Sequence, residues 1–246
     1  MTQPALVAVA HGSRDPAAVV ATAELVAAVR RARPGLPVLE AYLDHAPPAL
    51  SELAATLTEP FVVVPLLLGA AYHSQVDIPA ALSPAGALAT QADVLGPDPR
   101  LVAALERRLA EAGVVRGDGD TAVVLAAAGS SEASSLDSVR ALAAGWRDAG
   151  WWAVEPAFGS AAEPTVESAV ATLRGRGAPR VAVATYLLFP GVFADKLAAA
   201  GADVVSAPLA SAPEVVELVL ARYDAAVTGR LGTAAATDPP TVRTRR

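Results

Sequence analysis

The sequence of 246 residues contains no cysteine. This absence excludes disulfide bonds, thiolate metal sites and cysteine nucleophiles, so a bound metal ion would need histidine, carboxylate, hydroxyl or backbone oxygen ligands. Histidine is scarce as well, with three residues, and charged residues make up only 18% of the chain. The three histidines, His11, His45 and His73, are therefore the first candidates for a metal site.

Long hydrophobic runs are also missing, although 53% of the residues are hydrophobic. No stretch of about eighteen apolar residues is free of charge, proline and glycine, so no transmembrane helix can be placed. The apolar stretch at residues 5–10 is too short for a signal sequence and no basic leader precedes it, so we expect a cytoplasmic protein. The net charge of −6 argues against nonspecific binding to nucleic acid or to an acidic membrane.

Short β-rich runs alternate with amphipathic or alanine-rich stretches, a pattern typical of β-α-β units and a parallel sheet. Strands are expected at residues 5–10, 37–43, 61–68, 92–95, 121–127, 152–157, 180–188 and 202–207. Helices are expected at residues 16–33, 78–87, 99–112, 135–149, 192–200 and 213–227, and also after Pro48 and Pro164. The pattern predicts an α/β fold.

The same order of elements occurs twice, which indicates a duplication. We predict two tandem lobes at residues 1–115 and 120–228, each a four- to five-stranded parallel sheet flanked by helices. The polar, glycine-rich segment at residues 116–120 is the expected linker. Residues 229–246 are rich in Thr, Ala, Pro and Arg without periodicity, so we expect a disordered tail there.

Two histidines lie at the ends of predicted strands. His11 follows the first strand and His73 comes shortly after the third, and ligands of open α/β sheets bind beyond the carboxyl ends of strands. A single histidine in such a place often only hydrogen-bonds a loop. However, the second half has Ala128 opposite His11 and Phe193 opposite His73, so the scaffold does not need these imidazoles. We predict a metal site on the two histidines of the N-terminal lobe, lost from the C-terminal lobe.

Asp44, at the end of the second strand, is a candidate third ligand. Two imidazoles and one carboxylate can hold a divalent first-row metal and leave positions open. The alternative is that Asp44 caps the helix expected after Pro48. His45 is adjacent in sequence and is expected to point away from the site.

The loop after the first strand has the sequence Gly12-Ser13-Arg14-Asp15-Pro16. Gly12 permits close backbone approach, and Asp15 and Pro16 are typical of a helix start, where free N–H groups favour an anion. Ser13 and Arg14 could add hydroxyl and guanidinium donors to this anion site. The alternative is a turn that only starts the helix.

Several motifs of common enzyme classes are absent. The sequence has no Walker A motif, no G-x-G-x-x-G after the first strand and no G-x-S-x-G elbow. Nucleotide kinases, dinucleotide oxidoreductases and α/β-hydrolases are therefore disfavoured.

Three segments, taken together and in order, resemble a known family. Residues 7–16 (VAVAHGSRDP), 42–44 (YLD) and 64–79 (VPLLLGAAYHSQVDIP) are similar to the sirohydrochlorin chelatases. These class II enzymes insert ferrous iron or cobalt into a tetrapyrrole without ATP, here the octacarboxylate sirohydrochlorin. The resemblance covers residues 5–227, and its second half is similar to the long members, in which two chelatase lobes are fused and one keeps the site. Short members are similar to one lobe and pair as homodimers.

The resemblance implies the roles of individual residues. The two metal-binding histidines of the family fall on His11 and His73, and its carboxylate, usually Glu in a Phe-Leu-Glu pattern, falls on Asp44. Ala71 stands where the family commonly has glycine. One of the two histidines would accept the pyrrole protons, and the loop with Gly12, Ser13 and Arg14 would bind substrate carboxylates.

The implied function is that of a lyase, a sirohydrochlorin ferrochelatase or cobaltochelatase of siroheme or cobalamin biosynthesis. Its partners would be sirohydrochlorin and Fe²⁺ or Co²⁺, with the metal as substrate and no permanently bound cofactor. Both metals accept two imidazoles and an oxygen, so the residues do not choose between them. We expect a monomer whose lobes form a pseudo-dimer.

Two other functions fit parts of the sequence. A metal- or tetrapyrrole-binding carrier with the same fold would have the same residues and no turnover. A periplasmic-type binding protein also has paired α/β lobes, but the missing signal sequence and the short single linker count against it.

Overall fold

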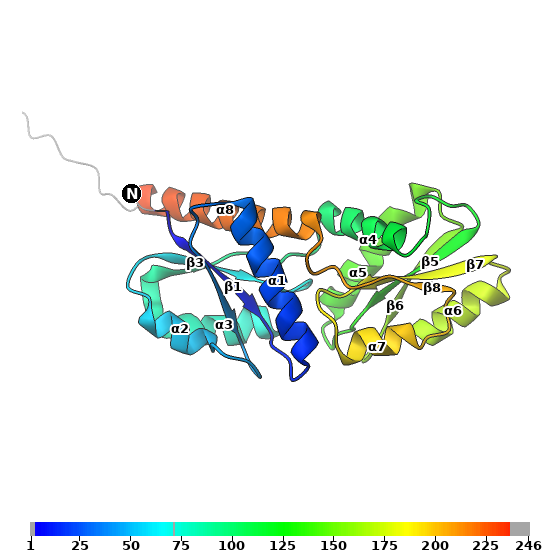
Figure 1. Cartoon of the computed structure of the whole chain (residues 1–246), viewed down its shortest axis with the longest axis horizontal. Coiled ribbons are helices and arrows are strands. Elements are labelled where there is room, and N and C mark those ends of the chain that lie inside the picture. Colours follow the sequence, from blue (N-terminus) through cyan, green and yellow to red (C-terminus); the bar gives the residue numbers. More distant parts are fainter. Residues whose placement is uncertain (1–2, 71, 237–246) are drawn as a thin grey trace, which may run out of the picture.

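The computed structural model describes residues 3–70 and 72–236. Two parallel four-stranded sheets lie side by side along the length of the molecule (Figure 1). One has the order β2-β1-β3-β4 and the other the order β6-β5-β7-β8. The strands are β1 (Ala5–Ala10), β2 (Val38–Tyr42), β3 (Phe61–Pro65), β4 (Ala89–Gln91), β5 (Thr121–Ala127), β6 (Ala153–Phe158), β7 (Arg180–Tyr186) and β8 (Val204–Val205). The predicted duplicated α/β architecture is confirmed.

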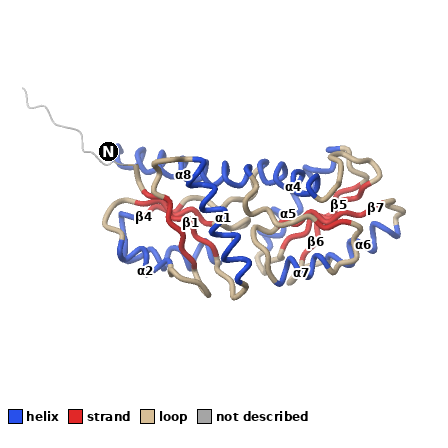
Figure 2. The backbone as a smooth tube through the Cα atoms, viewed as in Figure 1, coloured by secondary structure: helices blue, strands red, loops and turns tan. Residues whose placement is uncertain are grey.

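Helices cover both faces of each sheet, as Figure 2 shows. The sheet β1–β4, with its helices, is named lobe 1; α2 (Leu50–Thr56) and α3 (Ile78–Leu82) cover one face, and α1 (Pro16–Ala32) and α8 (Pro213–Ala236) the other. The sheet β5–β8 is lobe 2; α6 (Val166–Gly175) and α7 (Val192–Ala198) cover one face, and α4 (Pro99–Glu111) and α5 (Ala133–Trp146) the other. Shorter helical turns are η1 (His73–Asp77), η2 (Ser83–Leu88) and η3 (Arg147–Ala149).

The local sequence explains the central strands and the helix starts. Every residue of β3 and β5 is buried, as expected for apolar strands covered on both faces. Asp15 caps α1 by accepting a hydrogen bond from the Ala17 backbone N–H, with Pro16 as the first helical residue. Asp98 caps α4 in the same way through the Arg100 backbone N–H. The helix starts therefore fix where the strand-end loops lie.

Two helices cross between the halves of the chain. α4 follows the strands of lobe 1 but packs against β7, whereas α8 follows the strands of lobe 2 and packs against α1 and β3. In α8, Arg222 donates to the carbonyls of Val94 and Leu95, and the Tyr223 hydroxyl donates to the carbonyl of Pro4. One cluster of buried apolar side chains runs through both lobes. The two lobes therefore share a core.

Two expectations from the sequence are wrong in detail. The edge strand β4 lies at Ala89–Gln91, where it pairs with residues 61–63, and not at 92–95, which forms a loop. α8 extends to Ala236, so the expected irregular tail does not begin at residue 229; Arg230 holds this end of the helix by donating to the carbonyls of Ala87 and Leu88. Residues 237–246 lie outside the described part of the chain.

No helix in the described ranges combines the length and the apolar character that crossing a bilayer requires.

Candidate active site

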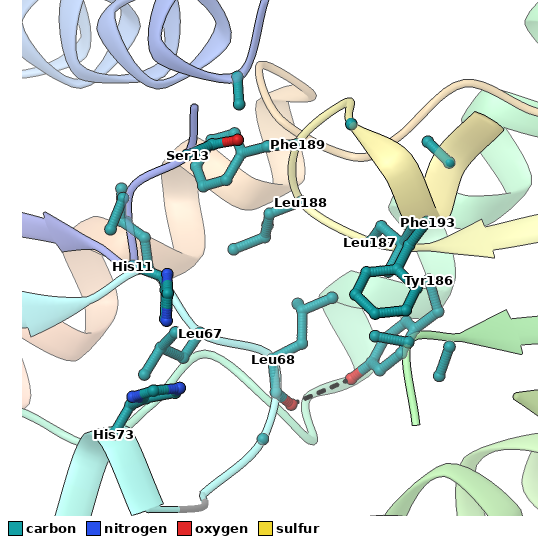
Figure 3. Close-up of a pocket in the computed structure, with 18 of the residues that line it drawn as sticks. His11, Ser13, Leu67, Leu68, His73, Tyr186, Leu187, Leu188, Phe189 and Phe193 are labelled. Carbon is teal, nitrogen blue, oxygen red and sulfur yellow. Dashed lines mark hydrogen bonds between the residues drawn. The ribbon is translucent and has the colours of Figure 1, made fainter. Parts of the chain in front are cut away.

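The structure brings His11 and His73 together (Figure 3). His11 is the first residue after β1, and His73 is the first residue of η1, which follows the loop after β3. Their ring centroids are 4.4 Å apart and the rings are inclined by 79°. The predicted juxtaposition of the two imidazoles beyond the carboxyl ends of neighbouring strands is therefore present.

Neighbouring oxygen atoms orient both rings. The Nδ1 atom of His73 lies 2.6 Å from Oδ2 of Asp77, and Nδ1 of His11 lies 3.1 Å from the carbonyl oxygen of Gly12. A proton on each Nδ1 satisfies these contacts and leaves the Nε2 lone pairs for a metal ion. Sequence reasoning missed Asp77; the signal was a carboxylate four residues after a histidine, the spacing of side chains on one helical face.

A cavity of about 640 Å³ lies between the lobes and contains both imidazoles. Figure 3 shows His11 and His73 on the lobe 1 side and Phe193, Tyr186 and Leu187 on the lobe 2 side. No carboxylate, lysine or arginine belongs to the cavity wall formed by the described residues. The cavity suits a large, mostly apolar molecule that reaches the histidines from one side.

The loop after β1 contributes only part of the predicted anion site. Gly12 has a φ of 92°, and a Cβ there would collide with the carbonyl oxygen of Asp44, so this turn requires glycine. Ser13 lines the cavity, and its hydroxyl accepts a hydrogen bond from the Asp15 backbone N–H. Arg14 is exposed and does not line the cavity. The predicted contact of Arg14 with substrate would therefore lie at the rim of the cavity.

Asp44 caps no helix, because α2 begins at Leu50 with Ala49 at its N-cap position. Its Oδ1 accepts a hydrogen bond from the His45 backbone N–H, and its Oδ2 lies 3.3 Å from Nε2 of His45. Within the described residues, no three histidine, aspartate or glutamate side chains form a group that could hold a metal ion. Ligation by Asp44 therefore stays a prediction, and the structure does not bring its carboxylate into a set with the two histidines.

His45 lies nearer the site than its sequence position indicated. Its ring centroid is 6.2 Å from that of His11. The backbone of His45 is left-handed, with a φ of 63°, and this turn directs the ring back toward the end of β1. The expectation that His45 points away from the site took no account of this turn.

Strand register identifies the equivalent positions in lobe 2. Ala127 and Tyr186 are the last paired residues of β5 and β7, and Phe193 follows Tyr186 by seven residues, as His73 follows Leu66. The turn around His45 is repeated at Ala161, which has a φ of 58°. The positions of His11, His45 and His73 are thus occupied in lobe 2 by Ala128, Ala161 and Phe193. Lobe 2 keeps the turns and has lost every imidazole.

Lobe 2 also contacts the loop that leads to His73. The Ser135 hydroxyl donates to the carbonyl of Ala70 at 2.9 Å, and the Tyr186 hydroxyl lies 3.5 Å from the carbonyl of Leu68. Burial, and secondarily the charge of Asp98, raise the pKa of Tyr186 well above its usual range, so its hydroxyl stays protonated as a donor. The two lobes together therefore shape the cavity around the histidine pair.

The fold and the site define a duplicated, parallel α/β protein with one histidine pair in the cavity between its lobes. The chain belongs to the CbiX family: the family model matches residues 5–112 and, a second time, residues 122–226. The double match agrees with the duplication derived from the strand order. No curated protein matches the chain in sequence.

Solved structures share the fold over nearly the whole chain. SirB from Bacillus subtilis with Fe³⁺ is 22% identical, with a TM-score of 0.75 over 96% of this chain and 98% of that one. The sirohydrochlorin chelatase SirB from Bacillus subtilis subspecies spizizenii in complex with cobalt is 21% identical, with a TM-score of 0.73 over 94% and 97%. CbiX, described as the terminal enzyme of siroheme biosynthesis in denitrifying bacteria, is 24% identical, with a TM-score of 0.68 over 91% and 99%.

Proposed function

We propose that this protein is a chelatase that inserts a divalent metal ion, Fe²⁺ or Co²⁺, into sirohydrochlorin without ATP. The observation that carries the proposal is the pair of imidazoles 4.4 Å apart inside an apolar cavity between two lobes. Membership of the CbiX family and the shared fold with a sirohydrochlorin chelatase bound to cobalt support the same function.

The residues suit the chemistry of metal insertion. The reaction must bring M²⁺ to four ring nitrogens and remove two pyrrole protons. His11 and His73 bind the metal substrate through Nε2, and neutral nitrogen ligands release it more readily than thiolates would. An imidazole that has given up the metal can take a pyrrole proton near neutral pH. The pair therefore serves both as donor of the metal and as acceptor of a proton.

The substrate carboxylates need partners outside the apolar cavity. We propose that Ser13 and Arg14 receive carboxylates at the edge of the macrocycle. The position of Ser13 at the cavity wall and the exposure of the adjacent Arg14 support this role. Asp44 would assist by supplying an oxygen ligand to the metal. Insertion of Fe²⁺ would serve siroheme biosynthesis, and insertion of Co²⁺ would serve cobalamin biosynthesis.

An anaerobic insertion assay tests the proposal. Sirohydrochlorin is mixed with Fe²⁺ or Co²⁺, and the change in its absorption spectrum is followed with wild type, His11→Ala, His73→Ala and no protein. We expect wild type to exceed the spontaneous rate and each variant to lose about 100-fold or more of this acceleration, as for loss of a reacting group. Equal rates with and without protein would reject the enzyme in favour of a carrier. Unchanged rates in both variants would reject the site.

A further inference from the structure

The wall of the cavity opposite the two histidines carries an exposed aromatic ring. Phe193, in α7, is 39% exposed, although large apolar side chains are normally buried. It lines the cavity and faces it from the lobe 2 side (Figure 3). Because its position is equivalent to that of His73, the same place in the fold presents a metal-binding group in lobe 1 and an apolar plane in lobe 2.

A positive charge accompanies this ring. The Lys196 ammonium lies 5.6 Å from the centroid of the Phe193 ring, one turn further along α7. Lys196 is the only lysine of the chain. Among the described residues, no carboxylate forms an ion pair with it. The lobe 2 wall therefore combines an exposed aromatic surface with an exposed ammonium group at its edge.

This combination complements a flat polycarboxylate. A tetrapyrrole has two apolar faces and carries its carboxylates on the rim of the ring. Metal insertion needs one face turned toward the histidines, so the other face must lie against lobe 2. An aromatic ring packs well on such a plane, and an ammonium beside it meets the charge at the rim.

We propose that lobe 2 positions the substrate: the Phe193 ring packs on the macrocycle face turned away from the histidines, and the Lys196 ammonium pairs with a carboxylate on its rim. This inference rests on the proposed function. It gives the lobe without imidazoles a direct part in substrate binding, and it makes Phe193 and Lys196 positioning residues that do not contact the metal.

Equilibrium binding of two porphyrins separates the contributions of these residues. An octacarboxylate and a dicarboxylate porphyrin are titrated into the full-length protein and followed by absorbance, without metal. The variants are Phe193→Leu, Phe193→Tyr, Lys196→Gln and Lys196→Arg. The matched controls are Val115→Ala, which shortens an exposed apolar side chain outside the cavity, and Arg31→Gln, which removes one exposed positive charge near the far end of α1.

Phe193→Leu should weaken binding of both porphyrins by about tenfold, and Phe193→Tyr should restore it. Lys196→Gln should weaken only the octacarboxylate, by about two- to fivefold as for an exposed ion pair, and Lys196→Arg should not. Co²⁺ affinity should be unchanged in all four variants. In the insertion assay, Phe193→Leu should raise KM for sirohydrochlorin more than it lowers kcat.

Unchanged porphyrin affinity in Phe193→Leu and Lys196→Gln would overturn this inference. An equal loss of Co²⁺ affinity in Phe193→Leu would also overturn it, because the residue would then act on the metal site. These results are distinct from failure of the proposed function, in which wild type would not accelerate insertion at all. Porphyrin binding needs no turnover, so the titration tests the lobe 2 wall in either case.

Discussion

At the scale of single residues, the properties of the site depend on which ring nitrogen each histidine turns toward the cavity. Asp77 lies within hydrogen-bond distance of Nδ1 of His73, and this contact both orients the ring and increases the electron density on Nε2. The Gly12 carbonyl does the same for His11 at a longer distance. The His73 ring therefore depends on a side chain that can be replaced.

Replacement of Asp77 by alanine is expected to lower the affinity for Co²⁺ by about 10- to 100-fold, the usual effect of losing a group that orients a ligand. Asp77→Asn keeps an oxygen acceptor for Nδ1 of His73, so its affinity for Co²⁺ is expected to lie between those of wild type and Asp77→Ala. Titration with Co²⁺, followed by visible absorption, measures both variants. A wild-type affinity in Asp77→Ala would show that the carboxylate does not support His73.

Gly12 and Gly35 provide a matched pair for the turn after β1. Both have left-handed backbone, with φ of 92° and 90°, but an added Cβ would strike the Asp44 carbonyl at Gly12 and meet nothing within 4 Å at Gly35. Gly35→Ala should lower the free energy of unfolding by about 1–2 kcal/mol, the penalty for left-handed backbone at a residue with a side chain. Gly12→Ala should lower the free energy of unfolding by clearly more, and urea unfolding measures both variants. Equal decreases in the two variants would mean that the turn after β1 can shift to accept a Cβ without loss of stability.

Some of these residue-level features could be predicted from the sequence and others could not. His11 and His73 could, because strand ends are visible in the hydrophobic pattern and parallel strands end at the same edge of a sheet. The place of His45 could not, because it depends on one left-handed turn, a backbone conformation that is uncommon for residues other than glycine. The positioning role of Phe193 also needed the structure, since an exposed ring in a cavity has the same sequence pattern as a buried one.

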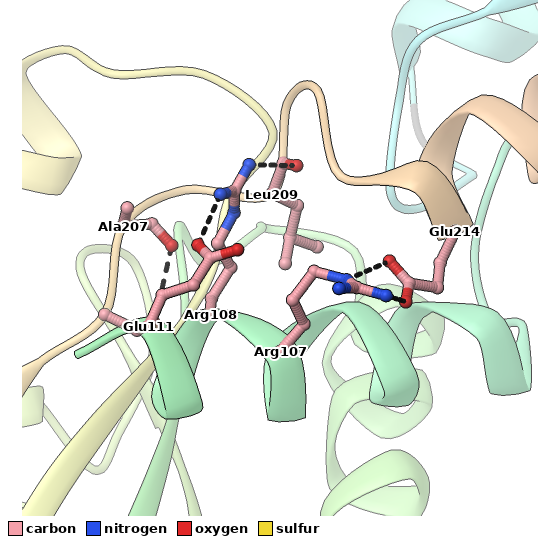
Figure 4. A network of polar contacts seen from close by, with 7 residues as sticks. Arg107, Arg108, Glu111, Ala207, Leu209 and Glu214 are labelled. Carbon is pink, nitrogen blue, oxygen red and sulfur yellow. Dashed lines mark hydrogen bonds and ion pairs between the residues drawn. The ribbon is translucent and has the colours of Figure 1, made fainter. Parts of the chain in front are cut away.

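At the scale of helices and strands, arginine side chains link α4 and α8 beside the apolar cluster that both helices share. Arg107 of α4 donates to the Glu214 carboxylate at the start of α8, at 2.6 and 2.9 Å, and Arg108 donates to the Leu209 carbonyl just before it (Figure 4). The hydrogen bond from Arg107 lowers the pKa of Glu214. Asp98, at the start of α4, contacts both Arg100 and Arg222 of α8.

Asp98 gives a test of this crossing that depends on pH. Its burial favours the neutral acid, but hydrogen bonds from Arg100 and the nearby charges of Arg100 and Arg222 outweigh this effect and lower the pKa of Asp98. Its contribution to stability is therefore fully present above the unfolded pKa of about 3.9 and is lost as the pH falls through the lower folded value.

Asp98→Asn should retain the helix cap and lose the charge, so it should destabilise the protein by about 1–3 kcal/mol at pH 7. The difference from wild type should shrink below about pH 4, where the native carboxylate itself becomes protonated. Urea unfolding at pH 7 and at pH 3 measures both values. A difference that does not change with pH would mean that the charge of Asp98 is not what holds the helices.

Element positions could be predicted better than element partners. The apolar runs of β1, β3 and β5 and the helix start at Asp15 are local signals, and the structure confirms them. The apolar residues in the first half of α8 indicate that the helix buries side chains, but not which sheet they pack against. Its attachment to lobe 1, and its extension past residue 229, depend on tertiary contacts such as those of Arg222 and Arg230.

At the scale of the whole molecule, we expect the exchange of helices to make the two lobes unfold as one cooperative unit. All three tryptophans, Trp146, Trp151 and Trp152, belong to lobe 2, whereas the histidine pair belongs to lobe 1. Tryptophan fluorescence and the proposed Co²⁺ binding would therefore report on different lobes. In a urea titration, the change in tryptophan fluorescence and the loss of Co²⁺ binding should occur at the same urea concentration, because one buried cluster spans both lobes. Transitions at clearly different urea concentrations would show that the lobes unfold independently.

The duplication explains why the chain has a single histidine pair. Both lobes keep the glycine turn after the first strand, at Gly12 and Gly129, and both keep the left-handed turn after the second. The imidazoles remain only in lobe 1, and lobe 2 supplies the opposite wall of the cavity. The central claim is therefore that metal binding belongs to lobe 1 and depends on both His11 and His73.

An anaerobic equilibrium titration with Co²⁺ tests this claim most directly. Wild type should bind a single equivalent of Co²⁺ per chain, with visible absorption bands that report nitrogen ligands. His11→Ala and His73→Ala should each lose these bands, whereas Phe193→Leu in lobe 2 should keep them. A second equivalent bound with similar affinity, or unchanged bands in both histidine variants, would contradict the account.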